Sequence, residues 1–307
     1  MPSWGELIGE FTSRQSEGRQ GWLVESLKQH MKRISELRGD RNVLFYASAF
    51  LQKPGVAGHL TAVTMEDIHG LMACFHGMDY SRGMTLILHT PGGVVAATQS
   101  LVSYLHSKFK DIECVVPTYA MSAGTMIALS TNRIVMGRQS QLGPIDAQLQ
   151  LAGGNQISAG AVVAQMREAY KQIKEDVTKA HVWAPILQSL GPSLYQESQY
   201  ALDFGRSMVK QWLHDRMFSG RADAAEKAEA VANYFNATDD HKLHGRRIDR
   251  EEAASKDLAI EELEANQELQ EAVLTSYHLM MLLFETSPAT KVMFTDGGKN
   301  WVKNFAQ

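Results

Sequence analysis

The chain has 307 residues, 44% hydrophobic and 21% charged, which is enough to bury a large core without disulfides or metals. Its net charge of −4 gives no overall basic surface, so nucleic acid is excluded as a default partner. Cys74 and Cys114 form no CxxC pair, and we expect buried, reduced thiols. No signal-peptide pattern begins the chain, and no stretch approaches the roughly 20 apolar residues that span a bilayer. We therefore expect a cytoplasmic protein without a membrane span.

The first predicted element is a helical stretch over residues 5–38, broken near Gly18 and Gly21 and ended by Gly39-Asp40. Short apolar runs then alternate with helices. Strands are predicted over residues 42–47, 84–89, 112–116 and 133–136, and helices over residues 64–75, 95–109 and 122–129. Apolar strands that alternate with helices favour an α/β fold with a mostly parallel sheet, covered on both faces.

Beyond residue 155 the pattern is helical almost to the C-terminus. Helices are predicted around residues 159–179, 198–218, 223–235, 250–255 and 268–285. We therefore divide the chain into an N-terminal helical segment (1–40), an α/β core (41–180) and a C-terminal helical region (181–307).

The first segment suited to chemistry is His89-Thr90-Pro91-Gly92-Gly93, at the end of a predicted strand. Paired glycines allow a sharp turn and the close approach of a ligand to the backbone. The N–H groups at the following helix start attract anions, including the oxyanion of an attacked carbonyl. Taken alone, the segment also fits an ordinary strand–helix turn.

The second segment is Ala120-Met121-Ser122-Ala123-Gly124, between a predicted strand and an apolar helix. This is the context of a nucleophile elbow, in which a sharp turn presents a reactive serine at the start of a helix. The segment departs from the G-x-S-x-G pattern, because Ala120 stands in place of the first glycine. The amide of Ala123 is then a second oxyanion donor. Taken alone, Ser122 fits a helix N-cap equally well.

The order of these two segments resembles the Clp-protease proteolytic subunit, signal peptide peptidase A and the wider crotonase-like superfamily. The nearest resemblance is to the serine dehydrogenase proteinase family. It is carried by the stretches LILHTPGG (86–93), YAMSAGTMIALSTNRIVMG (119–137) and SQLGPIDAQL (140–149). The resemblance implies a ClpP/crotonase-like core of repeated β-β-α units and a serine peptidase. It places the nucleophile at Ser122 and the oxyanion hole at Gly92, Gly93 and Ala123.

The general base is a separate question, because a serine hydroxyl needs a neighbour that takes its proton. The stretch that holds a histidine in the Clp subunit contains none here, which favours the Ser-Lys dyad of signal-peptide-peptidase-like enzymes. On the helix 159–179, Lys174 lies at the border of the apolar face, at about 120° from Val162, and Lys171 lies at about 180°. Lys174 is the predicted base and Lys171 an alternate. A surface lysine with a buried stem fits Lys174 equally well.

Histidines offer a further alternative. If folding brings His244 close to Ser122, this histidine, far along the chain from the serine, completes a triad. We rank His244 below Lys174 as the general base. His89 fits an ordinary strand end. Asp146 is expected to stabilise the loop that lines the site or to contact a neighbouring subunit. We weigh Asp240, His241 and His244 as metal ligands, but an HxxH pattern without a third partner is a weak signal, and we predict no metal.

Three functions are compatible with these residues. The first is a peptidase that forms an acyl-enzyme on Ser122. The second is a crotonase-type acyl-CoA enzyme, which uses paired amides without a serine. The third is a catalytically silent scaffold. No G-x-G-x-x-G or Walker motif occurs, so we predict no cofactor, and any ATPase is a separate chain. The family resemblance implies a homo-oligomer that acts on peptide or protein.

Overall fold

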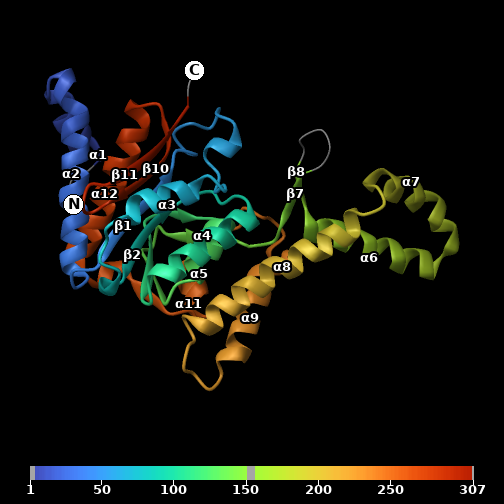
Figure 1. Ribbon diagram of the computed structural model, residues 1–307. Helices are drawn as coiled ribbons and strands as arrows, with labels where there is room; N and C mark the ends of the chain where they lie inside the picture. Colours follow the sequence, from blue (N-terminus) through green and yellow to red (C-terminus); the bar gives the residue numbers. More distant parts are fainter. Residues whose placement is uncertain (1–3, 151–155, 306–307) are drawn as a thin grey trace.

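The computed structural model describes residues 4–150 and 156–305 and is built around one seven-stranded sheet (Figure 1). The strand order is β11-β10-β1-β2-β3-β5-β9. The strands are β1 (Asn42–Ser48), β2 (Met84–His89), β3 (Ile112–Val116), β5 (Arg133–Met136), β9 (Ile260–Glu262), β10 (Ala289–Thr295) and β11 (Asn300–Asn304). All pairs from β1 to β9 are parallel, and β10 and β11 are antiparallel. The predicted α/β fold with a mostly parallel sheet is confirmed.

Helices cover both faces of this sheet because successive strand residues point to opposite sides. Leu44 and Tyr46 of β1 face a core shared with α3 (Asp67–Phe75), α4 (Val95–Lys108), α5 (Ala123–Leu129), α8 (Leu194–Asp215) and α9 (Ala224–Asn236). Val43 and Phe45 face a second core, shared with α1 (Trp4–Ser13), α2 (Ser16–Leu37) and α12 (Gln267–Thr286). A sheet buried on both faces explains why its strands read as continuous apolar runs.

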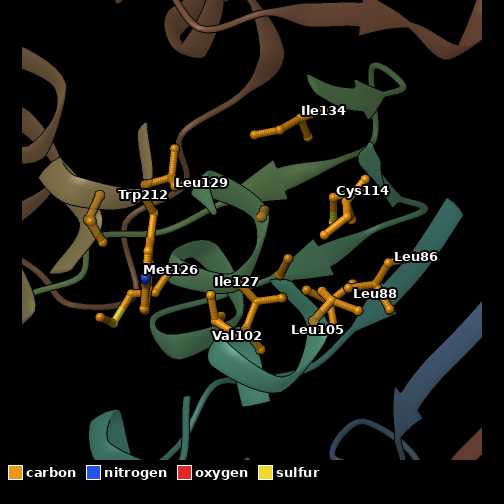
Figure 2. Packing of buried hydrophobic residues seen from close by; sticks show 14 of the residues in the cluster. Leu86, Leu88, Val102, Leu105, Cys114, Met126, Ile127, Leu129, Ile134 and Trp212 are labelled. Carbon is orange, nitrogen blue, oxygen red and sulfur yellow. The ribbon is translucent and has the colours of Figure 1, made fainter. Parts of the chain in front are cut away.

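The first core fixes the helix that follows Ser122. Figure 2 shows Met126, Ile127 and Leu129 of α5 between the sheet side chains and Trp212 of α8. Ile127 is 4% exposed and Met126 is 1% exposed. Burial of a side chain of this size contributes roughly 1.5–3 kcal/mol, so α5 is held firmly against the sheet.

An arm leaves the sheet at residue 148. The antiparallel pair β7 (Gln148–Gln150) and β8 (Gln156–Ser158) leads into α6 (Ala159–Glu175) and α7 (Ala180–Leu190). Figure 1 shows α6, α7 and the first half of α8 extending away from the sheet, and we call residues 159–204 the arm. No residue of α7 is buried. The arm carries several exposed large apolar side chains, among them Tyr170, Val182 and Tyr200.

The remaining elements are short. They are α10 (Thr238–His241), α11 (Arg250–Ala254) and the 3₁₀ turns at Gly58–Leu60, Tyr80–Arg82, Val177–Lys179 and Leu263–Ala265. No helix in the described residues combines the length and the apolar character needed to cross a membrane.

Two sequence predictions differ from the structure. The N-terminal helices separate at residues 14–15, and Gly18 and Gly21 lie inside α2. The sequence pattern beyond residue 155 predicts helices almost to the C-terminus, whereas β9, β10 and β11 join the main sheet. Polar residues interrupt the apolar pattern of β10, including the buried Lys291, and the sequence signal for a strand is correspondingly weak.

Candidate functional site

Short extended segments follow the main strands and form a second, smaller layer. β4 (Tyr119–Ala120) pairs in parallel with β6 (Gln141–Leu142). Single bridges extend this layer from Ala120 to Thr90 and from Leu142 to Ile248, and another joins Gly93 to Val63. Main strand, short strand and helix thus repeat as a β-β-α unit. This layer brings the diglycine turn, the Ser122 turn and residues 142–146 side by side.

Ser122 has a strained backbone, with φ of 51° and ψ of −115°. A non-glycine residue seldom takes a positive φ, and such outliers gather at functional sites. The side chain does not cap α5, although Ser122 occupies the N-cap position. The hydroxyl is partly exposed and forms no hydrogen bond within the described residues. The N-cap interpretation therefore does not account for this serine.

Its neighbours explain why the turn forms. Gly124 lies against Thr90, and a Cβ at this glycine would meet the Thr90 Cγ2 at 2.6 Å. The Thr125 hydroxyl donates to the Ala120 carbonyl at 2.7 Å and accepts from the Gly143 amide at 2.9 Å. Small residues and one buried hydroxyl therefore lock the turn between the adjacent segments.

Gly92 lies directly against the serine turn. Its φ is 101°, and a Cβ there would lie 2.7 Å from both the Met121 carbonyl oxygen and the Ser122 Cβ. The same Cβ would lie 3.0 Å from the Ala123 nitrogen. Only glycine permits this approach, because any side chain would overlap the serine turn. The two motifs that the sequence singled out therefore meet in space.

The three predicted oxyanion-hole residues differ in what their amides do. The Gly92 N–H donates to the Thr90 hydroxyl at 3.2 Å. Within the described residues, the N–H groups of Gly93 and Ala123 make no hydrogen bond. Gly93 is exposed, and Ala123 is the first residue of α5, where the helix dipole favours negative charge. The unpaired donors are therefore those of Gly93 and Ala123, while Gly92 shapes the turn.

His244 forms a hydrogen bond with the buried carboxylate of Asp146. Its Nδ1 is 2.7 Å from the Asp146 Oδ1, and the other carboxylate oxygen accepts from Gln148 and Ser158 at 3.0 Å each. Asp146 is 1% exposed. Burial alone would raise the pKa of Asp146, but the hydrogen bonds from His244 and Ser158 lower it below its usual value. The pair joins two of the residues that the sequence had left with open roles.

The two lysines predicted as general bases lie away from the serine turn. Lys171 and Lys174 lie in α6, and both side chains are exposed. Figure 1 shows that α6 extends away from α5, the helix that follows Ser122. The fold of a single chain therefore does not bring either lysine to Ser122.

His89 is fully buried at the end of β2. Its Nδ1 is 3.0 Å from the Thr118 hydroxyl, and Phe50 and Tyr277 pack on the ring with centroids 4.9 and 5.1 Å away. Burial lowers its pKa to about 3. This environment fits the predicted structural role. In the described residues no cluster of three His, Cys, Asp or Glu side chains could hold a metal ion.

The sequence interpretation missed a buried ion pair beside the diglycine turn. Lys291 of β10 donates to Asp67, to the Ala62 carbonyl at 3.0 Å and to the Thr64 hydroxyl at 3.1 Å. Val63, between these last two, accepts from the Val94 amide at 2.9 Å and donates to the Gly92 carbonyl at 2.8 Å. The pair therefore anchors the segment that brackets Gly93.

No local signal could have found this ion pair, because residues 67 and 291 are 224 positions apart. A lysine within an otherwise apolar run is the one sign of it in the sequence, and this run falls in the region 181–307 that the pattern predicts to be helical.

The chain is similar to several known proteins. A family model described as ClpP-like SDH-type serine proteinase matches residues 24–182, more than half of the chain. Two curated relatives are uncharacterized proteins of Methanocaldococcus jannaschii. MJ0137 is 37% identical over 87 residues, which are 28% of this chain and 30% of the relative. MJ1495 is 24% identical over 160 residues, which are 50% of this chain and 53% of the relative.

The chain thus spans about a third and about half of the length of these relatives. Among solved structures, a mutant of the 1510-N membrane-bound stomatin-specific protease is similar, with 16% identity and a TM-score of 0.38. That match covers 65% of this chain and 74% of the other.

Proposed function

This chain belongs to the ClpP-like SDH-type serine proteinases, and from that premise we propose that it hydrolyses peptide bonds through an acyl-enzyme on Ser122. One observation carries the proposal: a strained serine turn lies against a glycine turn, and the amides of Gly93 and Ala123 are unpaired beside it. That juxtaposition suits attack on a carbonyl better than it suits a helix cap.

The reaction proceeds in two halves. The Ser122 Oγ attacks the peptide carbonyl while a general base takes its proton, and the amides of Gly93 and Ala123 stabilise the oxyanion. Collapse of the tetrahedral intermediate breaks the C–N bond, and the amine leaves with the proton. Water then attacks the ester and loses a proton to the same base. Collapse of this second intermediate breaks the C–Oγ bond, the base returns the proton to the Ser122 Oγ, and the acid leaves. Lys174, Lys171 and His244 are the candidate bases.

Loss of one oxyanion donor typically lowers kcat by about 10²–10³-fold, so the two amides account for much of the expected rate. Family membership favours this function over the crotonase-type alternative and the scaffold. A CoA thioester enzyme would keep its activity after Ser122→Ala.

The test is labelling by a fluorophosphonate probe, which reacts with activated serines. We expect the wild type to be labelled and Ser122→Ala to be unlabelled. Ser103→Ala is the matched control, because Ser103 is an exposed serine on α4, and it should label like the wild type. Equal labelling of Ser122→Ala and the wild type would remove Ser122 as the nucleophile.

A further inference from the structure

We propose, on the premise of the peptidase function above, that Thr90 is a positioning residue that orients the oxyanion donors relative to Ser122. Thr90 directly follows β2 and is fully buried. Its backbone and its methyl group contact the serine turn, and its hydroxyl contacts the glycine turn at Gly92. One residue therefore joins the nucleophile to the turn that carries the Gly93 amide.

The backbone of Thr90 fixes the segment that leads to the serine. Its N–H donates to the Tyr119 carbonyl at 3.0 Å, and its carbonyl accepts from the Met121 amide at 3.1 Å. These two hydrogen bonds bracket Ala120, which is bridged to Thr90, and Ser122 comes directly after Met121. The start of the serine turn is therefore set by the end of β2.

The methyl group of Thr90 packs on the serine turn itself. A Cβ on Gly124 would lie 2.6 Å from the Thr90 Cγ2, so this methyl carbon occupies the space beside the bare glycine backbone. The Gly124 amide donates to the Met121 carbonyl at 2.7 Å and closes the turn around Ser122. The methyl group therefore limits how the turn can shift relative to β2.

The hydroxyl of Thr90 holds the glycine turn. It accepts from the Gly92 amide at 3.2 Å, while the Gly92 carbonyl accepts from the Val63 amide at 2.8 Å. The Gly92 carbonyl and the Gly93 N–H belong to one planar trans peptide group, so they point in opposite directions. With Gly92 held at both its amide and its carbonyl, the Gly93 N–H is directed away from Val63.

A diglycine turn needs such restraint. Glycine reaches many backbone conformations at little cost, so the turn does not keep its amide in one direction without contacts from outside. Gly92 is buried, and among the described residues the Thr90 hydroxyl is the partner of its N–H. A buried N–H without a partner is unfavourable, so loss of this hydroxyl would let the turn rotate and carry the Gly93 donor with it.

Substitutions at residue 90 separate the two side-chain contacts. Val keeps the methyl group and lacks the hydroxyl, Ser keeps only the hydroxyl, and Ala keeps neither. The experiment measures labelling by a fluorophosphonate probe over a range of probe concentrations, and records the limiting rate, the probe affinity and the labelled fraction at the end-point. The limiting rate reports the reaction at the serine, and the end-point reports the fraction of chains with a competent site.

We expect Thr90→Val to lower the limiting rate by about 10–100-fold, because a misdirected oxyanion donor should cost less than the loss of about 10²–10³-fold that follows its removal. The probe affinity should stay within about threefold of the wild type, since the donor acts mainly in the transition state. Thr90→Ser should react at least about tenfold faster than Thr90→Ala, because it restores the acceptor for the Gly92 amide.

Thr131→Val is the matched control. It removes another buried threonine hydroxyl, which donates to the Ala128 carbonyl at 2.7 Å, beyond the end of α5 that is far from Ser122. This variant should keep the wild-type limiting rate. The comparison therefore separates the effect of the Thr90 hydroxyl from that of losing a buried hydroxyl elsewhere.

Other results would overturn the assignment. A limiting rate within about threefold of the wild type in Thr90→Val would do so, as would equal rates for Thr90→Ser and Thr90→Ala, a comparison that still decides if Thr90→Val fails to fold. A lower end-point and melting temperature, with an unchanged rate for each remaining site, would leave Thr90 a structural role alone. Absence of Ser122-dependent labelling in the wild type would refute the peptidase and this inference together.

Discussion

Ser122 and Gly92 determine each other's conformation. The serine has a positive φ, and the glycine leaves no room for a Cβ between the two turns. Strain of this kind costs about 1–3 kcal/mol and persists only where the surroundings enforce it. The packing of α5 and the hydrogen bonds of Thr125 provide that enforcement.

Gly92→Ala should therefore reduce activity much more than it changes the fold. Its Cβ would overlap the Met121 carbonyl and the Ser122 Cβ, which displaces the nucleophile from the oxyanion donors. We expect at least a 100-fold loss in kcat/KM, because small displacements of catalytic groups have effects of this size. Gly58→Ala, where a Cβ meets nothing within 4 Å, is the control in the same turnover assay. Similar rates for the two variants would contradict the close approach.

His89 predicts a pH dependence of stability. Its folded pKa of about 3 lies below its ordinary value of 6.5, so unfolding takes up a proton between these two pH values. The contribution of His89 to stability is therefore complete above about pH 6.5 and falls by about 1.4 kcal/mol per pH unit as pH drops toward 3. Chemical denaturation at several pH values gives the unfolding free energy as a function of pH. For His89→Phe, the slope of this plot between about pH 3 and 6.5 should be shallower than that of the wild type by the equivalent of one proton. His59→Gln, at an exposed histidine, should keep the wild-type slope.

At the scale of elements, the small second layer organises the site. After β2, β3 and β5, the next few residues of the chain pair sideways with one another. The apolar runs of β1, β2, β3 and β5 were predictable because both faces of each strand are buried. The two-residue strands β4 and β6 were not predictable, because a pairing this short has no periodicity to detect.

Loss of the buried Lys291–Asp67 ion pair should strongly destabilise the fold. Removal of one partner leaves a buried charge uncompensated, which costs about 3–5 kcal/mol. We expect Lys291→Met to lower the unfolding free energy by that amount and to lower kcat, because the segment beside Gly93 loses its anchor. The control is Lys303→Met on the neighbouring strand β11, which breaks the exposed pair with Glu66 and should cost at most about 1 kcal/mol. Equal denaturant midpoints for the two variants would refute the anchoring role.

At the scale of the molecule, the arm is the feature that one chain leaves unexplained. Tyr170 is 71% exposed, Val182 is 65% exposed and Tyr200 is 66% exposed, all on the projecting helices. A large exposed apolar area is typical of an interaction surface, and several large apolar side chains are exposed on this projecting element. The expected homo-oligomer would cover them.

We therefore predict that the arm carries the subunit contacts. Tyr170→Asp combined with Val182→Asp should convert an oligomer into smaller species, because the charges would be buried in the interface. Light scattering coupled to size-exclusion chromatography measures the mass directly. Met72→Asp on α3, at a side chain 53% exposed outside the arm, should leave the mass unchanged. A monomeric wild type would refute the prediction.

Local pattern sufficed for the α/β class, the four central strands and the two separate turns at Gly92 and Ser122, because each depends on neighbours in the chain. The expectation that these two turns meet came from the family resemblance. The same pattern favoured Lys174 as the base, since helical periodicity describes the face of one helix and not the direction in which that helix leaves the fold. Folding alone brought His244 onto Asp146 across 98 residues and Lys291 onto Asp67 across 224. Such contacts are made between segments that no short-range rule relates, so only the packed sheet and its second layer could decide them.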